Sequence, residues 1–217
     1  GHRPAYDHII QGMVGIMHTT GTPETAPNKV GSPYVDYATG LMGAFAVTAA
    51  LMERERTGKG QRVDVPMIDA YAANSLPDML CVDSFMPNDM PDAEPLAVLR
   101  TFATRDGHVV GMAQQDNHFQ GICKAQECEH LLETDGMRNV GERIADFAPW
   151  LDALEVEIAK WPTDELLQRF DENGVPFGKV KTIREFAEDP QAKHNRTIFD
   201  AEDERAGTMR YVRYPGH

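Results

Sequence analysis

The sequence predicts an α/β protein in which a mostly helical N-terminal segment is followed by a small α+β domain. Over the first 85 residues, apolar side chains recur at helical spacing and only one short strand is indicated. Residues 83–95 contain three prolines and scattered acids, which is typical of a linker. From about 90 to 190, an Asp-Gly turn between two apolar runs predicts a β-hairpin, and helical segments follow it.

The N-terminal segment is predicted to contain three helices. The first covers residues 6–17, and a loop rich in Thr, Pro and Gly follows. The second begins near Asp36 and runs to Arg56, with Gly58 suited to a left-handed cap. Because almost every face from 41 to 52 is apolar, we expect this helix to be buried against a partner outside this chain.

A short strand and a third helix complete the N-terminal segment. Val63 and Val65 alternate with polar neighbours, which predicts the strand, and the third helix is expected at 68–79.

The middle of the sequence is predicted to begin with the hairpin. Its strands lie within 96–104 and 108–113, joined by Arg105-Asp106-Gly107. Helices are expected at 117–124, at 142–160 and from about 163 to Asn173-Gly174. Thr182 and Glu185 form a capping-box pattern that opens one more short helix, and a last strand is expected at 209–212.

Charge and composition exclude several classes of protein. The net charge of −13 argues against nucleic acid as a partner, although small phosphate-bearing molecules stay possible. The three cysteines, Cys81, Cys123 and Cys128, lack metal-ligand spacing and favour a reducing compartment without a disulfide framework. The apolar run 41–52 is too short to span a bilayer, and no signal peptide is visible, so we expect a cytoplasmic protein without a membrane partner.

Asp36 is the first candidate for chemistry. A carboxylate just ahead of a helix lies among unpaired backbone N–H groups at the positive end of the helix dipole, which favours the ionised form that a nucleophile needs. Thr39 and Gly40 leave room there for a bulky ligand. From spacing alone, however, a plain N-cap aspartate is the simpler interpretation.

Two further groups of polar residues are weaker candidates. Tyr6-Asp7-His8 forms a second polar cluster, for which ordinary helix-start chemistry is again the simpler interpretation, and on a helix His8 would point away from Tyr6. His108, His118 and His130 show no ligand pattern, so we interpret them as surface residues and predict no metal site.

Longer motifs carry a resemblance to a known family. RPAYD at 3–7, KVGSPYVDYATG at 29–40 and ERERTGKGQ at 53–61, followed by VDV at 63–65, strongly resemble the family III coenzyme A transferases. GVPFGKV at 174–180, with Glu185 and Asp189-Pro190, matches the C-terminal pattern of that family. The family includes formyl-CoA transferase and the carnitine and bile-acid CoA transferases, and α-methylacyl-CoA racemase is a relative with the same fold.

The resemblance implies a partial family III fold. Residues 1–88 would be the part of the large domain that carries the catalytic aspartate, 89–190 the small α+β domain, and 191–217 a segment returning to the large domain. The chain would then be a fragment without the family's N-terminal Rossmann-like half, and the full-length protein an interlocked homodimer. The glycine-rich loop of formyl-CoA transferase has no counterpart at 88–95, so specificity for formate and oxalate is not implied.

The resemblance also assigns roles to residues. Asp36 would attack an acyl-CoA and carry CoA as an aspartyl thioester to a carboxylic acid acceptor, with no permanently bound cofactor. Tyr6 and Asp7 would support the active site, and Met67 would lie near CoA. Two alternatives stay open: a racemase-type proton transfer, disfavoured because Tyr6 replaces the racemase histidine, and a non-catalytic fragment.

Overall fold

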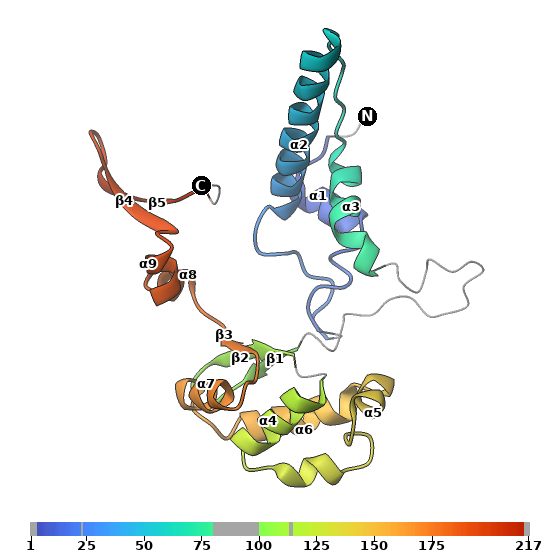
Figure 1. Ribbon diagram of the computed structural model, residues 1–217, viewed down its shortest axis with the longest axis vertical. Helices are drawn as coiled ribbons and strands as arrows, with labels where there is room; N and C mark the ends of the chain where they lie inside the picture. Colours follow the sequence, from blue (N-terminus) through green and yellow to red (C-terminus); the bar gives the residue numbers. More distant parts are fainter. Residues whose placement is uncertain (1–3, 23, 80–99, 113–114, 215–217) are drawn as a thin grey trace, which may run out of the picture. The chain divides into compact units, whose positions relative to one another are not determined.

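The computed structural model describes residues 4–22, 24–79, 100–112 and 115–214, which form two compact units (Figure 1). The first unit is Gly1–Ala97 and the second is Val98–His217. The linker predicted at 83–95, and with it the boundary predicted at 88, lies outside the described residues.

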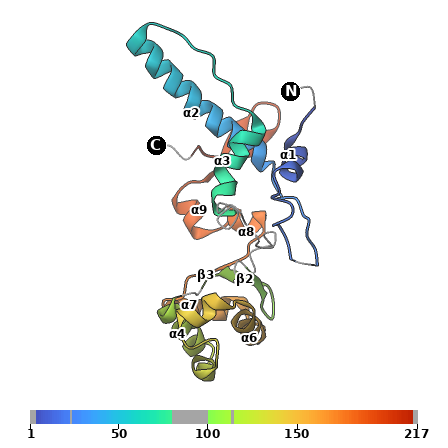
Figure 2. The same ribbon diagram turned by 90° about the vertical axis from the view of Figure 1, so that its right-hand side faces the viewer.

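The first unit is a cluster of three helices. Helices α1(Asp7–Met13) and α3(Met67–Met79) pack on the N-terminal part of α2(Tyr34–Thr57) (Figures 1 and 2). The core between them is small. Ile10, Val35 and Tyr71 are its buried residues, and partly buried side chains pack around them: Val14, Ile16 and Met67.

Within this chain most of α2 is exposed, so its burial against a partner outside the chain stays a prediction. Val35 and Ala38 are its buried residues, whereas Leu41, Phe45 and Met52 are 72%, 75% and 70% exposed. A helix of 24 residues is about 36 Å long. The seven-residue α1 and the described part of α3 cover only its beginning, so most of the apolar surface has no neighbour among the described residues.

The length of α2 also bears on the membrane prediction. The helix extends beyond the apolar run 41–52, and an 18-residue window within its 24 residues has a mean hydropathy of 1.4, so the helix would suffice to cross a bilayer by length and composition. The core helix of a soluble protein meets the same criterion, so this finding does not by itself assign α2 to a membrane.

The strand predicted at 63–65 is also absent from the described structure. Residues 59–66 lie between α2 and α3 without helical or strand structure. A strand requires a neighbour to take its backbone hydrogen bonds, and the described part of the first unit contains no other strand.

The second unit contains the predicted hairpin. Strands β1(Thr101–Ala103) and β2(His108–Gly111) pair antiparallel, with buried Phe102 opposite buried Val109. A third strand, β3(Phe177–Lys179), pairs antiparallel with the other edge of β2. Sequence analysis missed β3 because three residues around Gly178 show no clear alternation.

Two helices of this unit, α6(Ala148–Ile158) and α7(Thr163–Glu172), contact the sheet. Together with α4(Asp116–Ala125) and the 3-10 helix η1(Glu129–Glu133) they enclose the main core, and α5(Val140–Ala145) lies between η1 and α6 in the chain. The predicted single helix 142–160 is in fact α5 and α6. Pro149 in the first turn of α6 cannot donate a backbone hydrogen bond to a preceding turn, and Asp146 is extended, so the two helices separate there.

The C-terminal part continues from β3 through two short helices to a second hairpin. Helices α8(Ile183–Ala187) and α9(Pro190–His194) lead to β4(Ile198–Asp203) and β5(Gly207–Val212), which pair antiparallel. The predicted capping box of Thr182 and Glu185 is confirmed. The strand predicted at 209–212 is part of β5, whereas β4 and α9 were not predicted.

The two described cysteines lie in the core of the second unit. Cys123 and Cys128 are buried and free. A hydrogen bond between the two side chains, together with burial, raises the pKa of the Cys123 thiol. The Cys123 side chain is therefore a protonated thiol within the core. The third cysteine, Cys81, lies outside the described residues.

Candidate active site

Asp36 lies in the first turn of α2 with an exposed side chain. The N-cap position belongs to Pro33, which makes no side-chain cap bond, so the interpretation of Asp36 as a plain N-cap is wrong. Among the described residues, the Asp36 carboxylate makes no hydrogen bond and no ion pair. It therefore stands at the positive end of the helix dipole with its oxygens accessible to a ligand.

Asp7 takes the capping role that Asp36 leaves open. The backbone N–H of Val35 donates to Asp7 Oδ1 at 2.7 Å, and the N–H of Asp36 lies 3.4 Å from the same oxygen. The first turn of a helix exposes backbone N–H groups that have no partner within the helix. Because α1 supplies the carboxylate that satisfies them, the sequence-predicted residues Asp7 and Asp36 are brought together through the backbone of α2.

Gln11 holds the Asp7 carboxylate in place, a role that was not predicted from the sequence. Its side chain is fully buried, with 0% exposure, and Nε2 donates to Asp7 Oδ2 at 2.6 Å. Its Oε1 accepts the backbone N–H of Val30 at 2.9 Å. A polar residue four positions after Asp7, on the helix face that also carries Ile10 and Val14, was the available sequence signal.

Tyr6 lies just before α1 in extended conformation and is 69% exposed. Its ring is parallel to that of His8, with the centroids 6.4 Å apart and 2° between the planes. The prediction that His8 points away from Tyr6 is therefore wrong, because Tyr6 precedes the helix instead of forming its first turn. A phenol and an imidazole are thus adjacent next to Asp7.

Met67, at the start of α3, is partly buried against the small core of Ile10, Val35 and Tyr71. Tyr71 also contacts Tyr34 edge-to-face, with the ring centroids 5.7 Å apart. Met67 consequently packs behind the first turn of α2. The four sequence-predicted site residues are thus placed as follows. Asp36 lies on the first turn of α2, and Asp7 of α1 accepts a hydrogen bond from the backbone of that turn. Met67 packs against the core that includes Val35 of this turn, and Tyr6 directly precedes Asp7.

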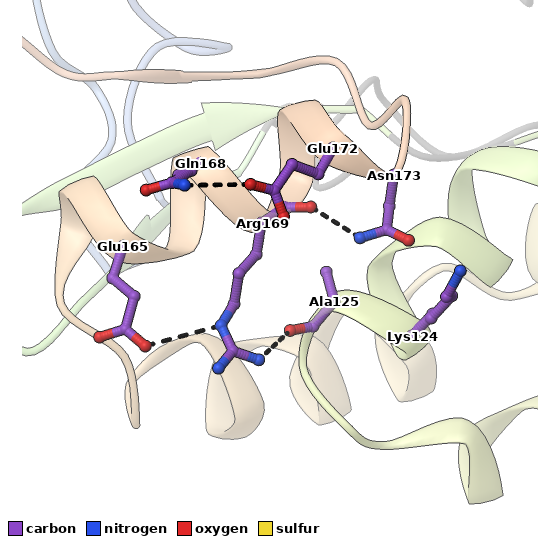
Figure 3. Close-up of a pocket in the computed structure, with 7 residues that line it drawn as sticks. All are labelled: Lys124, Ala125, Glu165, Gln168, Arg169, Glu172 and Asn173. Carbon is purple, nitrogen blue, oxygen red and sulfur yellow. Dashed lines mark hydrogen bonds and ion pairs between the residues drawn. The ribbon is translucent and has the colours of Figure 1, made fainter.

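A surface hollow of about 340 Å³ in the second unit lies between α4 and α7 (Figure 3). Its polar groups bond largely to one another: Arg169 donates to the carbonyl of Ala125 at 3.2 Å and pairs with Glu165 at 3.5 Å, and Gln168 donates to Glu172 at 3.0 Å. The Arg169 guanidinium also lies 4.0 Å from the centroid of the Trp161 ring. Because Arg169, Glu165 and Glu172 are already partnered, we interpret the residues around this hollow as a structural link between the two helices.

The predicted surface histidines His108 and His130 are exposed, whereas His118 is partly buried. Within residues 4–22, 24–79, 100–112 and 115–214, no group of three or more His, Cys, Asp or Glu side chains could hold a metal ion.

The fold and the helix-borne aspartate define a class of protein. The model of the CoA-transferase family III matches residues 1–217, and the chain belongs to that family.

Individual relatives are CoA-transferases in different organisms. The chain is 29% identical to the succinate–glutarate CoA-transferase of Agrobacterium fabrum, covering 97% of this chain and 53% of the relative. It is 32% identical to the succinyl-CoA:mesaconate CoA-transferase of Haloarcula marismortui, covering 93% and 51%.

Solved structures agree with this assignment. A crystal structure of Rv3272 from Mycobacterium tuberculosis superimposes with a TM-score of 0.81 at 26% identity, covering 100% of this chain and 58% of the other. A CAIB/BAIF family protein from Brucella suis gives a TM-score of 0.72 at 30% identity, covering 99% and 60%. The fold prediction of a partial family III fold is thereby confirmed, and the chain spans about half the length of the curated relatives it matches.

Proposed function

We propose that the protein transfers coenzyme A from an acyl-CoA donor to a carboxylic acid acceptor, with Asp36 as the covalent carrier. The observation that carries this proposal is the exposed Asp36 carboxylate in the first turn of α2, left without a partner because Asp7 satisfies the backbone of that turn. Membership of the CoA-transferase family III supports the reaction class.

The proposed reaction consists of four acyl transfers. Asp36 attacks the thioester carbonyl of the donor, the C–S bond breaks, and a mixed anhydride forms as CoA thiolate leaves. The thiolate attacks the Asp36 carbonyl, which releases the donor acid and gives the aspartyl-CoA thioester. The acceptor carboxylate then attacks this thioester, and the released thiolate takes the acyl group from the second anhydride, which restores the Asp36 carboxylate.

A carboxylate at a helix start suits each of these steps. Anhydride and thioester are both activated acyl compounds, so every transfer begins near energetic balance. The positive end of α2 favours the ionised nucleophile and the oxyanion of the tetrahedral intermediates. We propose that Tyr6, Asp7 and Met67 border the reacting groups and that no permanently bound cofactor takes part.

The relatives suggest a class of acceptor. The names of the two relatives given above specify glutarate and mesaconate, both of which are dicarboxylates. We propose a short dicarboxylic acid as the acceptor for this protein too. The second carboxylate of such a substrate would require a cation or N–H donors outside the cluster around Asp36.

Mass spectrometry tests the covalent step. The intact protein is incubated with succinyl-CoA, quenched and digested, and we expect a CoA adduct on the peptide that contains Asp36. Asp36→Ala should lower kcat by about 10⁴-fold or more, because no other group forms the covalent link. Asp69→Ala is the matched control, since Asp69 is an exposed aspartate in the first turn of α3. An unmodified Asp36 during turnover would refute the proposal.

The adjacent rings of Tyr6 and His8 support a second candidate, proton transfer at the α-carbon of an acyl-CoA. This reaction predicts deuterium incorporation at Cα from D₂O without any acceptor acid. Transfer of CoA without such exchange would eliminate it. The third possibility, a chain without catalytic activity, predicts that neither reaction occurs in the intact protein.

Assembly and location are further proposals for the whole protein. We propose that the whole protein forms a homodimer and is cytoplasmic, and that residues 191–217 return to the large domain. Light scattering of the intact protein and fractionation of cells test the first two, and cross-linking from this segment tests the third.

A further inference from the structure

Gln11 is a buried amide that the proposed chemistry does not use, yet it is connected to Asp36 by two short steps. We propose that Gln11 is a positioning residue for Asp36 and acts through the carboxylate of Asp7. This inference rests on the proposed function, because it concerns the alignment of the Asp36 nucleophile.

The first link is the carboxylate of Asp7, which bridges two elements. Its Oδ2 accepts from Gln11 Nε2 at 2.6 Å. Its Oδ1 accepts the backbone N–H of Val35 at 2.7 Å, and the N–H of Asp36 lies 3.4 Å away. The two oxygens of one side chain therefore join the Gln11 amide to the backbone of Asp36.

The second link is the loop that leads into α2. Gln11 Oε1 accepts the N–H of Val30 at 2.9 Å, and Nε2 lies 3.4 Å from the carbonyl oxygen of Ser32. These partners fix the orientation of the amide, because its oxygen can only accept and its nitrogen can only donate. One buried group thus holds α1, the loop and the start of α2, and a misplacement of about 1 Å in a reacting group can lower a rate about 10²-fold.

Replacement of Gln11 by glutamate separates positioning from packing, because the two side chains have nearly the same shape. A protonated carboxyl group at position 11 can donate to Asp7 and accept from Val30, as the amide does. An ionised one cannot donate, and it repels the Asp7 carboxylate. Burial and the neighbouring charge both raise the pKa of the introduced carboxyl group above its usual range.

Other titratable groups lie on α1, α2 and α3 and in the loop before α2. They are Asp7 and His8 on α1, Tyr34, Asp36 and Tyr37 on α2, Asp69 and Tyr71 on α3, and Lys29 in the preceding loop. Two of these groups, His8 and Lys29, can be cationic, and both are exposed. The buried carboxyl group would therefore be influenced mainly by Asp7, its direct neighbour.

The experiment measures kcat and KM of the intact protein with succinyl-CoA and a dicarboxylate acceptor between about pH 5 and 9. For Gln11→Glu we expect kcat close to wild type at low pH. Above the pKa of the introduced group, kcat should fall about tenfold for each pH unit relative to wild type, with KM changed less than about twofold. Gln120→Glu, the same change at an exposed glutamine of α4, should follow the wild-type profile.

A double variant, Gln11→Glu with Asp7→Asn, provides the second measurement. The amide at position 7 can accept from Val35 and donate to an ionised carboxylate at position 11, which restores the link with donor and acceptor exchanged. We expect the additional pH dependence to disappear in this variant. If the additional pH dependence persisted in the double variant, the inference would be overturned, because the link through position 7 would then not be the cause of that pH dependence.

Circular dichroism over the same pH range separates positioning from unfolding. The inference is also overturned if Gln11→Glu follows the wild-type profile while folded, or if its kcat falls only in proportion to the folded fraction. An inactive wild type overturns the proposed function and this inference together. An active wild type with a Gln11→Glu variant indifferent to pH overturns this inference alone.

Discussion

Two carboxylates, Asp7 of α1 and Asp36 of α2, meet at the start of α2 and have different environments. Asp7 is half-buried and accepts hydrogen bonds on both oxygens, whereas Asp36 is exposed and its oxygens accept none from the described residues. A carboxylate whose two oxygens both accept hydrogen bonds is held in place and is a poorer nucleophile, because lone pairs on each oxygen are engaged. The division into a fixed capping aspartate and a free aspartate is what makes Asp36 the candidate nucleophile.

Arg143 is a comparable single residue in the second unit. Its side chain is 1% exposed, donates to the carbonyl of Met137 at 2.7 Å and pairs with Asp116 at 2.6 Å. The guanidinium also lies 4.5 Å from the centroid of the Phe119 ring. One planar group therefore joins α4 to the segment before α5.

We expect Arg143→Met to lower the free energy of unfolding of this unit by about 2–3 kcal/mol, through the lost charged hydrogen bonds. Arg143→Lys should not restore it, because an ammonium group cannot reproduce the planar fork. Urea denaturation followed by the fluorescence of Trp150 and Trp161, both in this unit, measures the effect. Arg138→Met is the control, since Arg138 makes exposed ion pairs worth less than about 1 kcal/mol; equal effects at the two positions would contradict this account.

At the scale of elements, α2 ends as its sequence predicts. Gly58 has φ of 71° and its N–H donates to the carbonyl of Arg54 at 2.8 Å. Glycine adopts this left-handed conformation without the steric cost of a Cβ atom. The glycine thus stops the helix before residues 59–66, which form neither helix nor strand.

We expect Gly58→Ala to reduce the stability of α2 by about 1 kcal/mol, because a Cβ atom is strained at positive φ even though nothing lies within 4 Å of it. Gly60→Ala is the matched control, since Gly60 has equally open space and no positive φ. Amide hydrogen exchange in the last turns of α2 measures the difference. Similar exchange in both variants would show that the left-handed cap does not limit the helix.

At the scale of the whole molecule, the two units differ in how much core they contain. The second unit buries a continuous cluster that includes Phe102, Phe119, Trp150 and Phe170 at 0–1% exposure. In the described part of the first unit the core cluster consists of Ile10, Val35 and Tyr71, and α2 exposes most of its apolar surface. Burial of apolar surface is the main favourable term in folding, so the second unit has the greater capacity to fold independently.

We therefore expect residues 98–217, expressed alone, to unfold cooperatively and to show a near-ultraviolet dichroism signal from Trp150. Residues 1–97 alone should bind a hydrophobic dye and lack a cooperative transition, because α2 has little to pack against. A dye-binding, non-cooperative second unit would contradict the assignment of the core. The comparison requires only the two separate chains and the chain of 217 residues.

Local chemistry made much of the fold predictable. The hairpin at Asp106-Gly107, the cap at Gly58 and the capping box at Thr182 were all predicted, because each depends on a few adjacent residues. The strands β3 and β4 were missed, since a strand of only a few residues is defined by its pairing partner and not by its own sequence. The break before Pro149 was also missed.

For the site, the sequence by itself determined which residues are present: an aspartate at the start of an apolar helix, a Tyr-Asp pair, and motifs that identify the CoA-transferase family III. Only the tertiary structure decided that Asp7 caps α2, that Gln11 holds Asp7 and that Asp36 stays free. The physical reason is distance along the chain. Asp7 and Val35 are 28 positions apart, and which of two carboxylates satisfies a helix start depends on how α1 packs, which no local pattern encodes.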